Sequence, residues 1–175
     1  MRTVTYGGAV SLDGFLAGAH GAIDWLHFSK DVREVTKDYW KNVDTILMGR
    51  KTYQVAASQG RAGKVAMRSY VFSRTLQAID DPSVELVAGD AVEFVRDLKR
   101  RPGKGICLMG GGELAQSLLA ADLVDQIGLN IHPILLGSGI PTFRDPGHRV
   151  RLALTECRMI DGGCVLAYYK VLRAE

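Results

Sequence analysis

The sequence lacks the features that mark membrane proteins and nucleic-acid-binding proteins. No apolar run approaches the ~20 residues that a membrane-spanning helix requires. An excess of positive charge is missing as well, because 22 Lys and Arg stand against 19 Asp and Glu and leave a net charge of only +3. A charge this small, scattered along the chain, does not form the basic face that nucleic acids or anionic membranes bind. We therefore expect neither of them as a partner.

Cysteine is scarce, and its spacing excludes a zinc site. Cys107, Cys157 and Cys164 lie in apolar, strand-like runs without a Cys-x-x-Cys pair. An odd number of cysteines in such runs is typical of buried thiols in a reducing compartment. The first residues enter a strand-like pattern at once, so we expect no signal peptide. These features predict a cytoplasmic protein without a metal site.

The composition and the order of apolar runs predict one α/β domain over residues 1–175. Apolar residues make up 47% of the chain and charged residues 23%, which is usual for a globular protein. Short buried runs alternate with helical patterns, and the last two runs flank a hairpin turn at 161–163. This order predicts a three-layer α/β/α fold with a mostly parallel sheet and an antiparallel C-terminal hairpin. We expect strands at 4–10, 45–48, 69–72, 84–87, 106–109, 127–131, 151–159 and 164–171, and helices at 31–41, 50–57, 91–99 and from about 112.

A glycine-rich turn links the apolar run 106–109 to the helical pattern that follows it. Gly110, Gly111 and Gly112 form this turn, and Glu113 and Leu114 begin the helix. A strand, a glycine turn and a helix together aim backbone N–H groups at an anion, and glycine lets a phosphate approach closely. The pattern differs from the Gly-x-Gly-x-x-Gly fingerprint of dinucleotide sites. A tight turn without a ligand explains the glycines equally well.

Two further strand ends carry groups that suit phosphates. The segment Gly49-Arg50-Lys51-Thr52 sets a glycine, two cations and a hydroxyl at the start of a helix, and Ser73-Arg74 follows the next strand. Each of these on its own is also explained by a helix start or a solvated charge. Strand ends of a parallel sheet share one edge, so all three turns together favour a ligand with several phosphates, such as NADPH.

These motifs, in this order, resemble those of a known superfamily. Residues 46–53, 71–74 and 110–114 resemble the cofactor-binding segments of dihydrofolate reductases. Residues 110–143 are more similar to the reductase domain of bacterial riboflavin biosynthesis, and residues 11–17 resemble the opening motif of that domain. The similarity covers nearly the whole chain.

The resemblance implies a dihydrofolate reductase-like fold that binds NADPH. It places the nicotinamide near Ala9, Val10 and the loop at Asp13-Gly14. Riboflavin reductases are generally dimers, so the resemblance also implies a homodimer. The cofactor-binding residues implied are Val10, Gly49, Arg50, Lys51, Thr52, Ser73, Arg74, Gly110, Gly111, Gly112, Glu113 and Leu114.

The substrate pocket is expected between the end of the first strand, the loop at 24–25 and the segment 133–137. Trp25 would supply an aromatic wall, and Asp24 would orient the ring or pass a proton to it. Alternatively, Trp25 is core and Asp24 caps the next helix. The expected substrate-binding residues are Ala9, Ser11, Asp13, Asp24, Trp25, Pro133 and Leu135.

No residue stands out as the proton donor. Asp13, Asp24 and Asp31 are candidates, but Asp13 also suits an Asp-Gly turn and Asp31 also suits the first turn of a helix. None of the four histidines lies in a motif that identifies it as the acid. We expect an NADPH-dependent reductase of a small heterocyclic compound, either ribityl-pyrimidine-like or pterin-like. The alternative is a non-catalytic NADPH-binding sensor or regulatory module.

Overall fold

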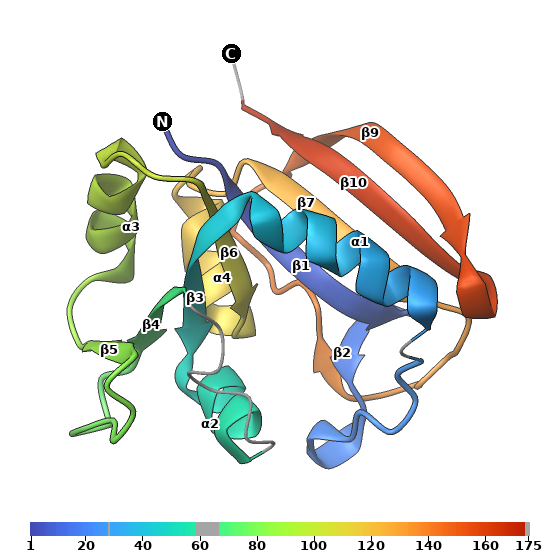
Figure 1. The fold of residues 1–175 in the computed structure, drawn as a ribbon, viewed down its shortest axis with the longest axis horizontal. Coiled ribbons are helices and arrows are strands. Elements are labelled where there is room, and N and C mark those ends of the chain that lie inside the picture. Colours follow the sequence, from blue (N-terminus) through green and yellow to red (C-terminus); the bar gives the residue numbers. More distant parts are fainter. Residues whose placement is uncertain (28, 59–66, 174–175) are drawn as a thin grey trace.

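The computed structural model describes residues 1–27, 29–58 and 67–173, and its centre is an eight-stranded sheet. The strands lie in the order β5-β4-β3-β6-β1-β7-β10-β9 (Figure 1). All neighbours pair in parallel except β10, which is antiparallel to both β7 and β9. The strands are β1 (Val4–Ser11), β3 (Val43–Gly49), β4 (Arg68–Phe72), β5 (Val84–Val87), β6 (Gly105–Gly110), β7 (Gln126–His132), β9 (Arg151–Ile160) and β10 (Cys164–Leu172).

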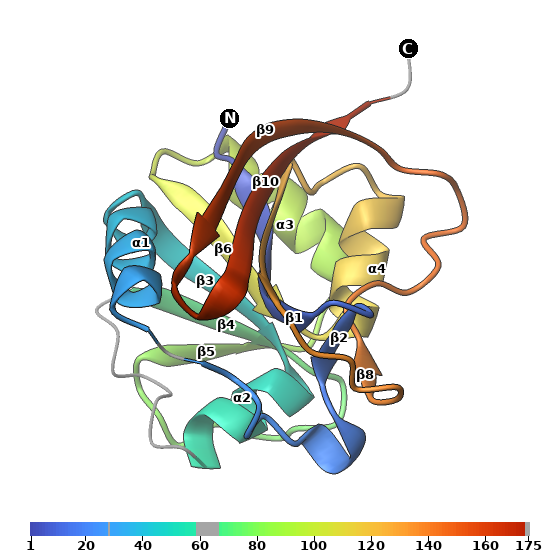
Figure 2. The same cartoon turned by 90° about the vertical axis from the view of Figure 1, so that its right-hand side faces the viewer.

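Helices cover both faces of the sheet, as the sequence predicted. On one face, α3 (Ala91–Arg100) and α4 (Gly112–Ala120) bury Val95, Leu98 and Leu118 against the strands. On the other face lie α1 (Lys30–Lys41) and α2 (Arg50–Ser58). Figure 2 shows α1 and α4 on opposite sides of the strands. A separate short pair joins β2 (Phe15–Ala17) to β8 (Ile140–Pro141), where the sequence indicated only a loop around 136–141.

Side chains fix the starts of two helices. The Ser29 hydroxyl accepts a hydrogen bond from the Val32 amide at 3.1 Å and begins α1. The Asp90 carboxylate accepts from the amides of Val92 and Glu93 at 2.8 and 3.0 Å and begins α3. Each cap satisfies amides that have no partner within the helix.

The sheet splits between its two central strands. Pairing of β1 with β6 ends at Tyr6 and Leu108, whereas pairing of β1 with β7 continues to Ser11 and His132. The last residues of β1 therefore have a partner strand on one side only. This split opens toward the carboxyl ends of the parallel strands.

The prediction that all three cysteines are buried is wrong for Cys157. Cys107 and Cys164 are buried free thiols, but Cys157 is exposed. It lies on β9, the outermost strand of the sheet, where most residues on both faces are exposed. An apolar strand-like run therefore did not mean burial at this edge. None of the helices in the described ranges is long and apolar enough to cross a membrane.

Candidate active site

The two glycine turns predicted from the sequence touch each other. Gly49 ends β3, and Gly111 precedes α4 with a φ of 99°. A Cβ added at Gly111 would lie 3.1 Å from the Gly49 Cα, and one added at Gly49 would lie 3.3 Å from the Gly111 Cα. Any side chain at Gly111 would therefore strain the backbone and press on the facing turn. Glycine at both positions brings two helix starts together at one point of the edge.

This junction leaves hydrogen-bond donors available to a ligand. α4 begins after Gly111 without a side-chain cap, so its first amides have no side-chain acceptor. A Cβ added at Gly110 would lie 3.3 Å from the Thr52 Oγ1, which places that hydroxyl of α2 at the same turn. The combination of uncapped amides, a hydroxyl and a helix N-terminus suits a phosphate.

Arg144 is a cation at this junction that the sequence did not reveal. A Cβ added at Gly112 would lie only 3.1 Å from the Arg144 Nε. The loop that carries Arg144 is held to α4, because the Gln116 side chain donates to the backbone oxygen of Asp145. Arg144 lies in an irregular segment more than thirty residues beyond the glycine turn, and no local motif marks it.

The third turn reaches the same edge next to Gly49. Gly49 of β3 pairs with Phe72 of β4, so Ser73 and Arg74 follow directly beside the first turn. The Ser73 Oγ accepts from the amides of Thr75 and Leu76 at 3.2 and 3.1 Å and shapes the turn. Among the residues that the structure describes, Arg74 forms no ion pair, and neither do Arg50 and Lys51. These cations are therefore available to an anion.

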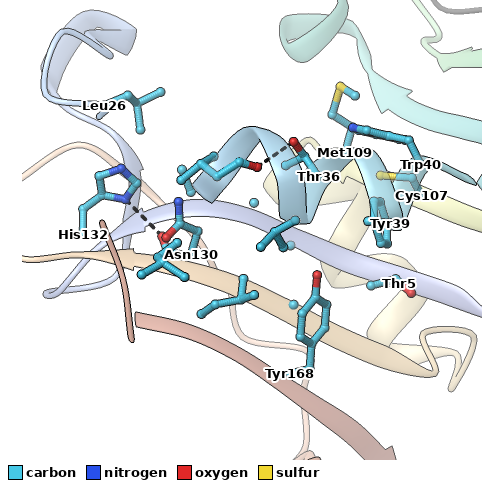
Figure 3. A pocket seen from close by; sticks show the side chains of 18 of the residues that line it. Thr5, Leu26, Thr36, Tyr39, Trp40, Cys107, Met109, Asn130, His132 and Tyr168 are labelled. Carbon is cyan, nitrogen blue, oxygen red and sulfur yellow. Dashed lines mark hydrogen bonds between the residues drawn. The ribbon is translucent and has the colours of Figure 1, made fainter. Parts of the chain in front are cut away.

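A cavity of about 270 Å³ lies between α1 and the sheet (Figure 3). Its floor comes from β1, β6, β7 and β10, and its roof is the face of α1 that carries Val32, Val35 and Tyr39. The roof is the apolar stripe that the helical spacing had indicated. The polar side chains that line the cavity are Thr5, His27, Thr36, Tyr39, Trp40, Cys107, Asn130, His132 and Tyr168.

Glycines in the floor let backbone and ring atoms lie close together, and one of them faces open space. Gly7, Gly8 and Gly128 all line the cavity. A Cβ added at Gly8 would meet nothing within 4 Å, whereas one added at Gly128 would lie 2.5 Å from the ring of Tyr168. The Tyr168 ring therefore lies directly over the backbone of β7. The sequence showed the glycines of the first strand, but not that α1 would lie opposite them.

His132 lies at the end of the cavity nearest the sheet edge, and both of its ring nitrogens are engaged. The His132 Nε2 accepts a hydrogen bond from the His27 amide at 3.2 Å. Its Nδ1 lies 3.2 Å from the backbone oxygen of Asn130, so Nδ1 carries the proton in this arrangement. The ring of Trp25 packs edge-on against it, with 5.3 Å between centroids. These contacts fix the side chain in place.

The opposite end of the cavity holds two phenols and a thiol. Burial raises the pKa of Tyr39 and of Tyr168, and it raises the pKa of the Cys107 thiol to about 11. All three groups therefore stay protonated and uncharged at neutral pH. Together they form a polar but neutral end wall (Figure 3).

Of the residues expected to bind substrate, Ala9 is the one that lines the cavity. Val10, expected at the cofactor, and Ser11 are both buried. Pro133, Leu135 and Asp24 are exposed and lie outside the lining. Trp25 also lies outside the lining, but its ring packs against His132, which is part of it.

Two of the candidate acids serve structural contacts. The Asp13 carboxylate accepts hydrogen bonds from the Ser11 hydroxyl at 2.6 Å and from the amides of Leu136 and Gly137. These bonds, that of Ser11 foremost, lower the pKa of Asp13. Asp31, in the first turn of α1, accepts from the Asp161 amide at 3.3 Å and ties α1 to the C-terminal hairpin.

Comparison with known proteins identifies a family and several relatives of this chain. Residues 2–166 match the RibD C-terminal domain. Two proteins of Bacillus subtilis (strain 168) are similar over most of their length. YyaP is 34% identical, covering 92% of this chain and 90% of its own, and YwjB is 31% identical, covering 97% and 98%.

Solved structures show the same fold. A putative riboflavin biosynthesis protein from Shewanella sp. PV-4 superposes with a TM-score of 0.87 at 26% identity and covers 98% of this chain and 100% of its own. Dihydrofolate reductase from Enterococcus faecalis, solved with NADP(H), gives a TM-score of 0.71 at 13% identity and covers 97% and 96%. That second likeness bears on the fold alone. The chain belongs to the RibD C-terminal domain family and has the dihydrofolate reductase-like fold.

Proposed function

We propose that this protein is an NADPH-dependent reductase that transfers a hydride to a small heterocyclic compound held in the cavity under α1. The observation that carries the proposal is the split between β1 and β6. Gly7, Gly8 and Ala9 beyond the end of this pairing line the cavity, which suits a flat ring, and Met109 of the cavity lining directly precedes the glycine junction, which suits a pyrophosphate. A dinucleotide laid along the edge would reach from one to the other.

The residues of the edge fit the phosphates of NADPH. The amides after Gly111, the Thr52 hydroxyl and the Arg144 guanidinium would hold the pyrophosphate. Arg50, Lys51 and Arg74 supply more positive charge than a pyrophosphate needs, and Arg74 beside β4 would read the 2′-phosphate. When bound, NADPH supplies the hydride, and the protein supplies position and exclusion of water.

The remaining residues position the substrate rather than donate protons. α1 covers the cavity and keeps water from the ring. Asp13 is poorly suited to give a proton, because its hydrogen bonds stabilise the carboxylate form and lower its pKa. We infer that Ala9 and Gly8, at the split, lie next to the reacting ring.

Cofactor preference tests the proposal. Arg74→Ala and Arg50→Ala should each weaken NADPH binding about tenfold and NADH binding less than about twofold, because only NADPH carries the 2′-phosphate. Calorimetry with both cofactors measures this, and Arg96→Ala on the exposed side of α3 is the matched control. Equal losses for the two cofactors would show that these arginines do not read the 2′-phosphate. A wild-type protein that binds neither cofactor would overturn the proposal itself.

The alternative is a module that binds NADPH without catalysis. It is favoured by one observation, namely that His132 and Asp13 are both engaged in hydrogen bonds within the protein. It predicts NADPH binding without NADPH oxidation across a panel of pterins, pyrimidines and carbonyl compounds. Turnover of any of these above background decides for the reductase.

A further inference from the structure

The lining of the cavity under α1 is neutral. Its described residues include hydroxyls, a thiol, an amide, an indole and imidazoles, but no Asp, Glu, Lys or Arg. The phenols and the thiol at its far end stay protonated because burial disfavours their charged forms. By contrast, the carboxyl ends of the parallel strands carry the cations Arg50, Lys51, Arg74 and Arg144. The two halves of the site thus differ sharply in charge.

Several polar groups of the lining are already satisfied by the protein. The Thr36 hydroxyl donates to the Val32 backbone oxygen at 2.7 Å, and the Thr5 hydroxyl donates to the Gln126 side chain at 3.2 Å. His132 is bonded through both nitrogens. An ion enclosed here would lose its hydration without gaining a counter-charge, which costs several kcal/mol in proteins. The cavity is therefore matched to an uncharged ligand.

One side chain of the lining does lack a partner. The Asn130 Oδ1 is buried and accepts no hydrogen bond from the residues that the structure describes. Asn130 lies on β7 in the middle of the floor, between His132 and Tyr168 (Figure 3). This oxygen is an acceptor, and a buried acceptor that receives no hydrogen bond is costly. A ligand with a ring N–H at this position would satisfy it, and a carbonyl beside that N–H would accept from the Asn130 side-chain NH2 group.

We propose that this cavity binds an uncharged, flat ring compound that carries an N–H beside a carbonyl group, with the Asn130 amide as its polar anchor. The reaction that follows rests on the proposed function, but the binding does not. A pyrimidine that carries a ribosyl phosphate, a protonated pterin or a ring with a carboxylate does not match this lining. In this proposal, the cavity selects its substrate through the absence of charged side chains and not through a cation that binds an anionic group.

Calorimetry on the cofactor-free protein tests this with matched probes. 2-Quinolone is a flat, uncharged heterocycle with an N–H beside its carbonyl, and 2-quinolone-4-carboxylate is the same ring with a negative charge. 2-Quinolone should bind at least about tenfold more tightly than the carboxylate, and uridine 5′-monophosphate should bind most weakly. Equal or tighter binding of either anion would overturn the proposal.

Two substitutions locate the effect within the cavity. Asn130→Leu should weaken 2-quinolone about tenfold but leave naphthalene, which lacks both the N–H and the carbonyl, within about twofold. Thr36→Lys should strengthen 2-quinolone-4-carboxylate several-fold, whereas Thr36→Met, of similar length but uncharged, should not. Thr36 is exposed at one side, so both variants should fold, and thermal melting checks this. Equal effects of Asn130→Leu on both neutral probes, or of Lys and Met at Thr36, would contradict the proposal.

The outcomes separate this inference from the proposed function. NADPH binding together with a preference for anionic probes would leave a reductase with a different substrate class. 2-Quinolone binding without any NADPH binding would support the neutral cavity and overturn the reductase.

Discussion

At the scale of single residues, Asp13 joins parts of the chain that are far apart in sequence. Its carboxylate holds the amides of Leu136 and Gly137 and is itself held by Ser11. These contacts fix the loop after β7 beside the end of β1, at the carboxyl edge of the sheet. A residue that the sequence offered as an acid thus also acts as a clamp.

Asp13→Ala should release this loop and lower the melting temperature by a few degrees, since three acceptor contacts are lost. Amide hydrogen exchange should become faster at Leu136 and Gly137. In the wild type, the stabilisation is complete above the ordinary aspartate pKa of about 3.9 and is lost as the pH falls through the lowered pKa of the folded state. Asp24→Ala, in an exposed turn, is the control. Unchanged exchange in Asp13→Ala would contradict the role of a clamp.

Gly112→Ala tests the glycine junction separately from folding. The new Cβ would press on the Arg144 side chain, which can move, so the melting temperature should change little. The moved guanidinium and the added methyl should weaken NADPH binding about tenfold. Gly89→Ala, where a Cβ would meet nothing within 4 Å, provides the comparison. Unaltered NADPH affinity would show that the phosphates bind elsewhere.

At the scale of elements, α1 acts as the roof of the cavity and α3 as support for the opposite face. Both helices begin with a side-chain cap, at Ser29 and Asp90. Ser29→Ala and Asp90→Ala should each cost about 1 kcal/mol of stability. Only Ser29→Ala should also weaken 2-quinolone binding, because α1 contacts the cavity and α3 does not. Equal binding losses in the two variants, measured by calorimetry, would mean that general stability rather than the roof controls the ligand.

The sequence predicted these elements well because each has a local cause. Periodicity marks the strands and helices, Ser29 marks the start of α1, and glycines mark the turns. Three features had no such local signal. Arg144 reaches the glycine junction only through the fold of the chain. The space above Gly8 exists only because α1 spans it. The Asn130 Oδ1 lacks a hydrogen-bond partner only because of the residues that surround it in the fold. Patterns along the chain do not reveal such contacts between residues that are far apart in sequence.

At the scale of the whole molecule, β9 is an edge strand that leaves apolar side chains in solvent. Leu154 is 56% exposed and Met159 is 81% exposed. Long exposed edges of this kind are usually covered in the native assembly. We expect a homodimer that uses β9, with a mass by light scattering of about twice the 19.1 kDa of one chain.

Charged substitutions identify the surface that the dimer uses. Leu154→Lys combined with Met159→Lys should give a monomer, whereas Leu135→Lys, in an exposed loop away from β9, should not. A wild-type protein that is monomeric at micromolar concentration would remove this expectation. A dimer that survives both lysines would place the interface on another surface.

The central position of β1 also determines when the chain can fold during its synthesis. Val4, in the first strand made, pairs with Ile106, so its partner emerges about a hundred residues later. At roughly 5–20 residues per second, the ribosome needs about 5–20 s to supply it. Until then, the apolar segment that becomes the middle of the sheet waits without either neighbour. The nascent chain is thus exposed to misassembly for seconds, and its stable folding begins only when β6 and β7 have left the ribosome.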